Sequence, residues 1–213
     1  MPELPDVAGF KRYLDATSLH QTVDSVSVPD ERILEDVTPQ QLGAHLSGKE
    51  LASSNRHGKF LFAEVPDTGW LVLHFGMSGT LKYEQSGGPV HEHTRAIFRF
   101  SSGARLLMIC QRMLGQVSFT ADREAFIRVH SLGPDALAEE LSRERFGAIL
   151  HESRGALKPA LMEQTKIAGI GNVYADEILF HAGVHPTLKG NELTEEQIDA
   201  LYYNLHRVLT TAA

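Results

Sequence analysis

Residues 59–75 read KFLFAEVPDTGWLVLHF, two apolar runs on either side of the turn Pro66-Asp67-Thr68-Gly69. Proline, aspartate and glycine favour turns, and short runs rich in aromatic and branched residues are typical of strands. The stretch therefore predicts a β-hairpin with strands at Lys59–Val65 and Trp70–Phe75.

Further short runs precede and follow this hairpin, separated by turns of glycine, serine and aspartate. They lie at His20–Val28, Gly79–Tyr83, Arg95–Phe100, Arg105–Cys110 and Gly115–Phe119. Many short strands with such turns predict a β-sandwich or barrel. A helix is expected to lead this half at Asp6–Ala16, since Val7, Phe10 and Leu14 fall on one stripe. A second short helix is expected at Pro39–Leu46.

The pattern becomes helical after Ser131-Leu132-Gly133-Pro134, which marks a domain boundary. Helices are expected at Ser142–Glu152, Leu157–Gln164 and Asn172–Ala182. The sequence Thr194-Glu195-Glu196-Gln197 is a capping box that begins a final apolar-striped helix. We therefore expect an α+β protein, with an N-terminal β-sandwich domain and its leading helix at residues 1–132, and an all-α domain at residues 133–213.

The composition is that of a packed globular protein, with 42 % hydrophobic and 22 % charged residues among 213. The single cysteine, Cys110, excludes a disulfide framework and any zinc site built on paired cysteines within this chain. No apolar run approaches the length of about 18 residues that a membrane span needs, and the first residues lack a signal-peptide pattern. We expect a cytoplasmic protein that has no membrane partner.

The net charge of −7 argues by itself against a nucleic-acid partner, because phosphate binding depends on lysine and arginine. The distribution of the charge along the chain argues less strongly against nucleic-acid binding than the net charge does. Residues 133–213 carry −5 of this charge, whereas His93–Ala121 contains four arginines and no acidic residue. A local basic patch is what a polyanion needs. The alternative, solvated arginines on strands, stays open on charge alone.

Pro2 follows Met1, and a small second residue usually permits removal of the first methionine. The secondary amine would then have a pKa near the α-amino reference of about 7.7–8.0, well below the value of about 10.4 for lysine. Such an amine can attack an electrophilic carbon and form an iminium ion. Glu3 could supply general acid or base catalysis beside it. On these residues alone, a start without chemical meaning stays open.

Four stretches stand out along the chain: Met1–Asp6 (MPELPD), Arg56–Leu61 (RHGKFL), His74–Gly79 (HFGMSG) and Ile170–Leu179 (IGNVYADEIL). In this order they resemble segments of the formamidopyrimidine-DNA glycosylase and endonuclease VIII family of DNA-repair enzymes. The resemblance covers residue 1 to about 210, and Leu4 favours the formamidopyrimidine-DNA glycosylase branch. It implies a helix-two-turns-helix motif in the second half.

The resemblance also implies a reaction, a bifunctional glycosylase with abasic-site lyase activity (β,δ-elimination) on oxidised purines. Pro2 would attack the sugar C1′ of a damaged nucleotide, expel the base and form a Schiff base. Glu3 would protonate the sugar ring oxygen or shuttle protons. Lys59 would contact a phosphate next to the lesion, a role that suits a compact point charge; an exposed strand lysine is the alternative.

The implied DNA contacts include residues that fill the gap left by the extruded base. Met77 matches the inserting methionine, and Arg112 matches an arginine that replaces the base. Leu114 stands where the family has an aromatic residue and Met113 where it has a second arginine, which removes one charge near the DNA. Core packing is the alternative for Met77 and Leu114.

Further DNA contacts are expected outside this group. Asn172 would act as the N-cap of a helix and donate to a phosphate oxygen, with the backbone amides of the preceding glycine turn assisting. Lys158 matches a family lysine near the lesion strand. His91 and His93 are expected in a loop near phosphate, and no further residue gives them a metal-ligand spacing.

The family continues beyond the last helix with a zinc finger of four cysteines, which this sequence lacks. Two explanations stay open: the chain is truncated before the finger, or it is a reduced form of the family without one. We expect no bound zinc and no other cofactor, weaker DNA affinity, and a monomer acting on double-stranded DNA that contains oxidised bases or abasic sites. Two alternatives remain: a damaged-DNA-binding protein of the same fold with lost or reduced catalysis, and a tautomerase that uses a terminal proline as its base.

Overall fold

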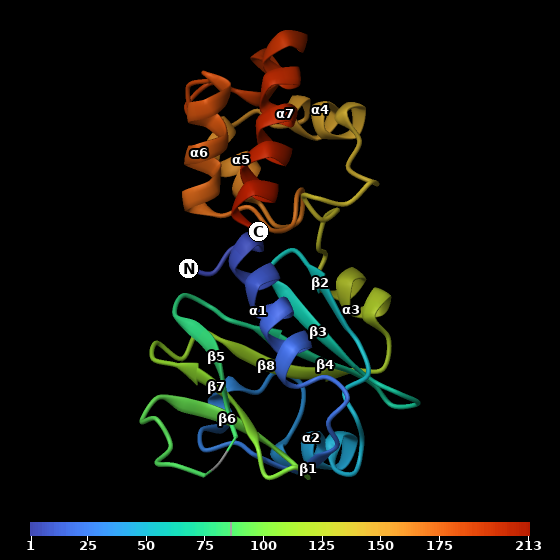
Figure 1. The fold of residues 1–213 in the computed structure, drawn as a ribbon. Helices are drawn as coiled ribbons and strands as arrows, with labels where there is room; N and C mark the ends of the chain where they lie inside the picture. The colour runs from blue at the N-terminus through green and yellow to red at the C-terminus, as the bar shows by residue number, and fades with distance from the viewer. Residues whose placement is uncertain (86) are drawn as a thin grey trace. The chain divides into compact units, whose positions relative to one another are not determined.

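The computed structural model describes residues 1–85 and 87–213, which divide into two compact units (Figure 1). The sheet unit contains Met1–Pro2 and Val7–Phe126. The helical unit contains Ile127–Ala213 together with Glu3–Asp6 from the start of the chain. The N-terminal residues are thus shared between the units.

The strands of the sheet unit form two four-stranded antiparallel sheets, ordered β1-β6-β7-β5 and β2-β3-β4-β8 (Figure 1). Their bounds are β1 Val23–Ser27, β2 Ser54–His57, β3 Phe60–Val65, β4 Gly69–His74, β5 Gly79–Glu84, β6 Thr94–Phe100, β7 Arg105–Cys110 and β8 Gln116–Thr120. The predicted hairpin is confirmed as β3–β4, in which Phe60 pairs with His74 and Val65 pairs with Gly69.

Apolar side chains from both sheets meet in one buried cluster. Leu61 and Leu73 from one sheet and Phe98 and Met108 from the other are fully buried in it. Burial of two apolar faces against each other is the packing that stabilises a sandwich. The structure therefore confirms the predicted α+β class with an N-terminal β-sandwich.

Three helices and one short 3-10 turn accompany the sheets: α1 Leu4–Thr17, η1 Glu31–Ile33, α2 Pro39–Leu46 and α3 Arg123–Val129. Beyond its first turn, α1 packs on the sheet core through Val7 and Leu14. A capping box of Thr38 and Gln41 begins α2. Both helices match the prediction, whereas β2 and α3 were not expected from the sequence.

The helical unit contains α4 Arg143–His151, α5 Leu157–Met162, α6 Asn172–Ala182, η2 Gly190–Glu192 and α7 Glu195–Ala212. The predicted capping box of Thr194 and Gln197 begins α7. The core of this unit includes Leu4, whose side chain is fully buried. Among the described helices, none combines the length and the apolar character that crossing a membrane requires.

Candidate catalytic residues and nucleic-acid interface

The carboxylate of Glu3 lies at the N-terminus of α6 within the helical unit and is almost fully buried. It accepts hydrogen bonds from three backbone amides: Gly171 at 2.7 Å, Val173 at 2.9 Å and Tyr174 at 3.3 Å. Free amides and the positive end of the helix dipole favour an anion at this place. Glu3 therefore fills the anion site that the glycine turn builds.

Two glycines shape this turn around the start of the chain. A Cβ at Gly171 would lie 2.6 Å from Oε1 of Glu3, and a Cβ at Gly169 would lie 2.7 Å from Cδ1 of Leu4. Gly169 also has φ 118°, which side chains strongly disfavour. Its carbonyl accepts a 3.0 Å hydrogen bond from the amide of Leu4. Glycine at both positions lets the N-terminal segment approach.

Gln164 holds the same turn from inside. Its Nε2 donates to the carbonyls of Met162 at 2.7 Å and Ile170 at 2.8 Å, and its Oε1 accepts from the amide of Gly169 at 2.9 Å. Sequence reasoning missed Gln164 as part of the site, since two of its three partners, Gly169 and Ile170, lie in the glycine turn beyond the end of α5. The side chain fixes the turn that in turn positions Glu3.

The predicted N-cap role of Asn172 is wrong. Gly171 is the N-cap, Asn172 is the first helical residue, and no side chain of the cap residue bonds back to the helix. The reason is that Glu3 supplies the capping carboxylate. The amides of Gly171, Val173 and Tyr174 are consequently donors to Glu3. The exposed side chain of Asn172 remains the candidate phosphate contact at this turn.

Burial raises the pKa of the Tyr174 phenol, and the negative charges of Asp6 and Glu3 raise it further. The protonated phenol thus lies in the field of the acidic N-terminal segment. Lys158, the other predicted contact of this unit, donates to the carboxylate of Asp176 at 2.7 Å. The carboxylate of Asp176 therefore partly neutralises the ammonium group of Lys158.

In the sheet unit, Lys59 lies in the turn between β2 and β3 and is 7 % exposed. The alternative of an exposed strand lysine therefore does not hold. His74 lies at the end of β4, and burial lowers its pKa to about 4, with the positive charge of Lys59 as the second cause. Its Nδ1 is buried and has no hydrogen-bond partner among the described residues. His74 begins the HFGMSG stretch but was not predicted as a site residue.

Three predicted contacts of the sheet unit, Met77, Arg112 and Leu114, lie on two adjacent loops and are named here the insertion group. All three are exposed, Met77 by 44 % and Leu114 by 51 %. The Nη1 of Arg112 lies 3.8 Å from the sulfur of Met77. Exposure excludes core packing for Met77 and Leu114. Met113 instead turns toward the sheet core, with φ 52°.

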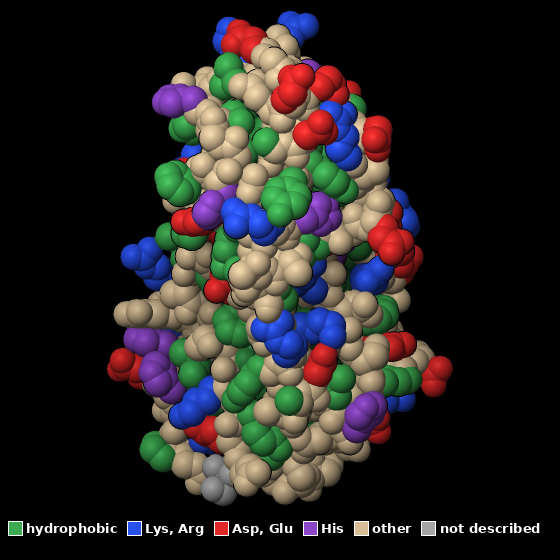
Figure 2. Space-filling view, turned by 45° about the horizontal axis from the view of Figure 1, so that its top comes forward, with side chains coloured by type: hydrophobic (Ala, Val, Ile, Leu, Met, Phe, Trp, Pro, Cys, Tyr) green, Lys and Arg blue, Asp and Glu red, His purple; other side chains and the backbone are tan. Residues whose placement is uncertain are grey.

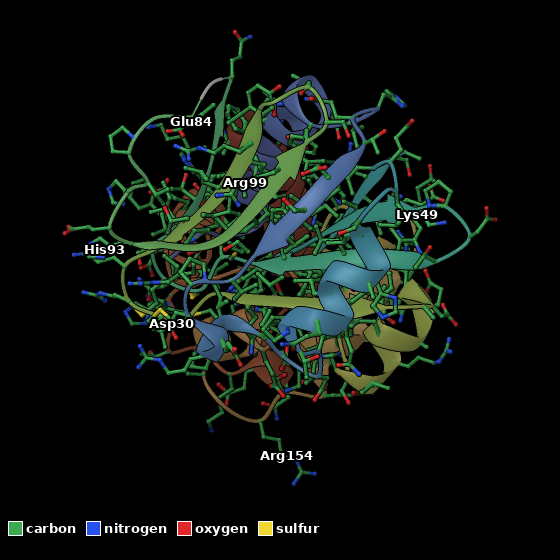
Figure 3. All side chains as sticks on the ribbon, turned by 90° about the horizontal axis from the view of Figure 1, so that it is seen from below. Asp30, Lys49, Glu84, His93, Arg99 and Arg154 are labelled. Carbon is green, nitrogen blue, oxygen red and sulfur yellow. The ribbon has the colours of Figure 1, made fainter. Side chains whose placement is uncertain are left out.

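His91 and His93 lie in the loop before β6, and their rings are 5.5 Å apart. Figure 3 shows His93 pointing outward from this loop. His93 Nε2 lies 3.2 Å from a carboxylate oxygen of Glu92. Within residues 1–85 and 87–213, no group of three or more His, Cys, Asp or Glu side chains could hold a metal ion.

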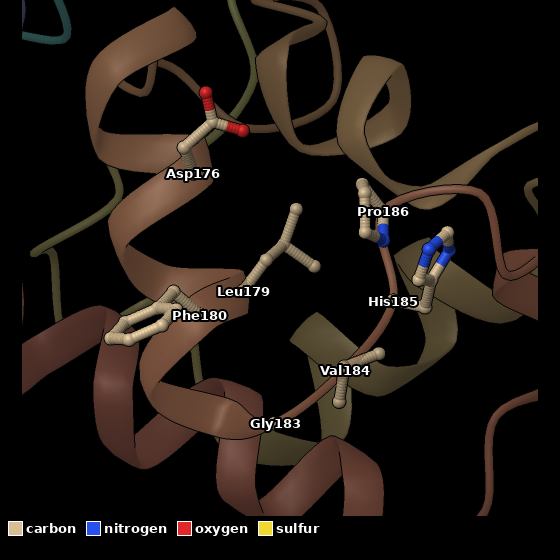
Figure 4. Close-up of a pocket in the computed structure, with 7 residues that line it drawn as sticks. All are labelled: Asp176, Leu179, Phe180, Gly183, Val184, His185 and Pro186. Atoms are coloured by element: carbon tan, nitrogen blue, oxygen red, sulfur yellow. The ribbon is translucent and has the colours of Figure 1, made fainter.

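A surface pocket of about 500 Å³ lies along the second half of α6 (Figure 4). It is lined by Asp176, Leu179, Phe180, Gly183, Val184, His185 and Pro186. Leu179 projects from α6 toward the segment that carries Val184 and Pro186 (Figure 4). The pocket contains no predicted site residue, and only Asp176 joins it to one, Lys158.

The charged side chains are mixed in sign on the face that Figure 2 presents, where Lys and Arg lie among Asp and Glu.

Pro2 is half-buried and Met1 is 52 % exposed. Pro2 is bonded directly to Glu3. Since the Glu3 carboxylate is held in place, the nitrogen of Pro2 lies only one residue from an anchored side chain. Each unit thus carries its own share of the predicted residues.

Comparisons with known proteins point in one direction. Residues 1–117 match the family model of the formamidopyrimidine-DNA glycosylase N-terminal domain, and residues 132–213 match that of the formamidopyrimidine-DNA glycosylase H2TH domain. The chain is 36 % identical over 212 residues to the formamidopyrimidine-DNA glycosylase of Solibacter usitatus, covering 100 % of this chain and 77 % of that protein. The enzyme of Synechococcus elongatus is 35 % identical over 214 residues, with coverage of 98 % and 75 %.

The fold is also similar to solved structures. The Lactococcus lactis formamidopyrimidine-DNA glycosylase, non-covalently bound to DNA containing an AP site, superposes with a TM-score of 0.93 at 28 % identity. The match covers 99 % of this chain and 81 % of that one. A related complex, an inhibited enzyme with DNA containing N7-benzyl-Fapy-dG, gives a TM-score of 0.93 at 29 % identity.

Proposed function

This chain belongs to the formamidopyrimidine-DNA glycosylase family, and we propose that the amine of Pro2, once Met1 is removed, is its nucleophile. The protein is a DNA glycosylase of base excision repair, and damaged DNA is its partner. The observation that carries the proposal is the carboxylate of Glu3, held by three amides at the N-terminus of α6 directly beside Pro2. We propose oxidised purines as the substrate class.

The reaction begins when the lone pair of the Pro2 nitrogen attacks C1′ of the damaged nucleotide. A C1′–N bond forms, the sugar ring C1′–O4′ bond opens, and the base leaves with its glycosidic electron pair and a proton. The product is a cationic iminium ion, because a secondary amine has no second proton to lose. That cation acidifies the C2′ proton. Its removal expels the 3′ phosphate, a second elimination expels the 5′ phosphate, and water then releases the sugar fragment.

The side chains divide the remaining tasks. Glu3 is proposed to protonate the sugar ring oxygen and to move protons during the eliminations. Its three amide donors hold the carboxylate in one orientation, which favours proton transfer along a fixed line. Lys59 is proposed to bind a phosphate next to the lesion.

DNA contacts are proposed for both units. The insertion group would enter the space of the extruded base, and Lys158 and Asn172 would contact phosphates of the lesion strand. His91 and His93 would approach phosphate from their loop. We propose residues 1–132 as the catalytic domain and residues 133–213 as the helix-two-turns-helix DNA-binding domain.

The zinc finger that the resemblance implies does not fit the residues of this chain. Its one cysteine, Cys110, is buried in the sheet core and accepts a hydrogen bond from the amide of Gly115. We therefore assign no step to a metal, and we propose that the amine and side chains perform the reaction without a cofactor. We also propose a monomer that acts in the cytoplasm, at the nucleoid if the cell is bacterial.

Borohydride trapping on DNA with one abasic site tests the proposal. An imine at Pro2 is reduced to a stable covalent adduct, and peptide mass analysis assigns the adduct to Pro2. The control is the same protein with a short N-terminal extension retained, which removes the free proline amine and should give no adduct. Intact mass reports whether Met1 is absent. Binding to abasic DNA without any adduct would instead support a damaged-DNA-binding protein.

A further inference from the structure

Two loops of the sheet unit meet at Gly76. One is the turn between β4 and β5, residues 75–78, and the other connects β7 to β8, residues 111–115. Gly76 is buried and has φ 56°, and a Cβ there would overlap the carbonyl group of Leu114 and lie 2.6 Å from the amide nitrogen of Gly115. Only a residue without a side chain permits this approach of two backbones.

Two further contacts join the loops and anchor the second one. The backbone amide of Arg112 donates to the hydroxyl of Ser78 at 3.3 Å. The amide of Gly115 donates to the sulfur of Cys110 at 3.3 Å. Met113 adopts a left-handed φ of 52° and directs its side chain to the sheet core. The residues on either side of it, Arg112 and Leu114, remain exposed.

We propose that Gly76 is a positioning residue that joins the two loops, so that Met77, Arg112 and Leu114 enter DNA as one preformed unit. The inference rests on the proposed function, because it concerns how the insertion group acts. A group ordered before binding loses less conformational freedom when it enters a base stack than two independently mobile loops would. The 3.8 Å contact between Arg112 and the sulfur of Met77 shows that side chains of the two loops also touch each other.

A joined insertion group matters only where a base must leave a duplex. An abasic nucleotide in single-stranded DNA has neither a base to extrude nor an opposite strand to fill, so its cleavage depends on the amine and not on insertion. The Gly76→Ala variant is therefore expected to lose about 10- to 100-fold in kcat/KM for excision of 8-oxoguanine from a duplex. Cleavage of a single-stranded abasic oligonucleotide by the same variant should change less than about threefold.

The matched control is Gly103→Ala. Gly103 lies in the turn between β6 and β7 of the same unit, has φ 86°, and has no atom within 4 Å of the position of a Cβ. It meets the same backbone strain without the contact between loops. Both reactions of this variant should match those of the unsubstituted protein. Ser78→Ala, which removes only the acceptor of the Arg112 amide, provides a milder second variant with the same direction of effect.

A fluorescent 2-aminopurine next to the lesion reports unstacking directly, without catalysis. Its emission should rise on binding of the unsubstituted protein and of Gly103→Ala, and rise less with Gly76→Ala and Ser78→Ala. Equal emission for all four proteins, or an equal loss of duplex and single-strand cleavage in Gly76→Ala, overturns the proposal. Absence of a borohydride adduct with the unsubstituted protein rejects the proposed function instead, and the emission measurement still decides the role of Gly76.

Discussion

The carboxylate of Glu3 accepts a 2.7 Å hydrogen bond from the backbone amide of Gly171, 168 residues further along the chain. The two residues are in contact because Gly171 has no side chain, since a Cβ there would lie 2.6 Å from Oε1 of Glu3. The position of Glu3, the proposed proton donor, therefore depends on the lack of a side chain at Gly171 in a distant turn. This relationship makes the turn itself a target for experiment.

Replacement of Gly171 by alanine should displace the Glu3 carboxylate while leaving the fold intact. The atoms that the new methyl group would meet first all belong to the side chain of Glu3, which can move without a shift of the backbone. We expect kcat for base excision to fall about 10- to 100-fold, with little change in DNA affinity. Single-turnover kinetics and equilibrium binding measure the two quantities. Gly155→Ala in the same unit, where a Cβ meets nothing within 4 Å, is the control and should behave as the unsubstituted protein.

Replacement of Glu3 by glutamine keeps the size of the side chain but removes its charge and its ability to exchange a proton. Base excision should fall about 10²- to 10⁴-fold, the usual contribution of general acid–base catalysis. The double variant Glu3→Gln with Gly171→Ala should be no slower than Glu3→Gln alone, because residues in direct contact act non-additively. Multiplied effects in the double variant would separate Gly171 from Glu3.

His74 should make the stability of the sheet unit depend on pH. Its pKa is about 4 when folded, against 6.5 for the free side chain. Well above pH 6.5 the imidazole is neutral in both the folded and the unfolded state, and its effect on the free energy of unfolding is absent. As the pH falls from 6.5 to 4, the unfolded state takes up the proton first, so the free energy of unfolding decreases by roughly 3 kcal/mol in total. Urea titrations followed by the fluorescence of Trp70, the single tryptophan, measure this decrease.

The His74→Asn variant is the comparison for this pH dependence. Asparagine does not titrate in this range, so the decrease between pH 6.5 and 4 should become shallower by about the same amount. An unchanged slope in the variant would assign the acid sensitivity to other groups.

The ion pair of Lys158 and Asp176 should restrain DNA binding. Asp176→Asn frees the ammonium group and is expected to tighten binding about two- to fivefold at low salt, in keeping with the modest energy of partly exposed pairs. Lys158→Ala should weaken binding and lower the slope of log Kd against log salt by about 1. Lys189→Ala, which removes an exposed lysine paired with Glu192 at 3.1 Å, is the control. A salt slope for Lys158→Ala equal to that of the control excludes a phosphate contact.

Most of the fold was predictable because its strands and helices carry their own local signals. The hairpin of β3 and β4 has strongly apolar strands and a turn rich in breakers, and α7 has a complete capping box. Strand β2 was missed because its residues, SNRH, are polar and all half-buried, so no alternation marks them. Helix α3 was missed because Phe126 is the only buried residue among its seven, so no apolar stripe marks it.

The candidate site was less predictable, because its geometry depends on contacts between distant residues. Asn172 follows a glycine turn and looks like an N-cap by local rules, but Glu3 takes the amides of that turn. The three hydrogen bonds of Gln164 and the buried Nδ1 of His74 likewise depend on packing. The roles of Pro2 and of the insertion group remain predictions for the experiments above.

The position of Leu4 bears on whether the helical unit can be produced as a separate fragment. Its side chain fills a place in the core of the helical unit, although it lies near the opposite end of the polypeptide from most of that core. A fragment that begins at residue 127 would expose a cavity the size of a leucine and leave the amide of Gly171 without an acceptor. The helical half is therefore not a self-contained domain. A fusion of it to another protein would need to include a short peptide with a leucine in the place of Leu4.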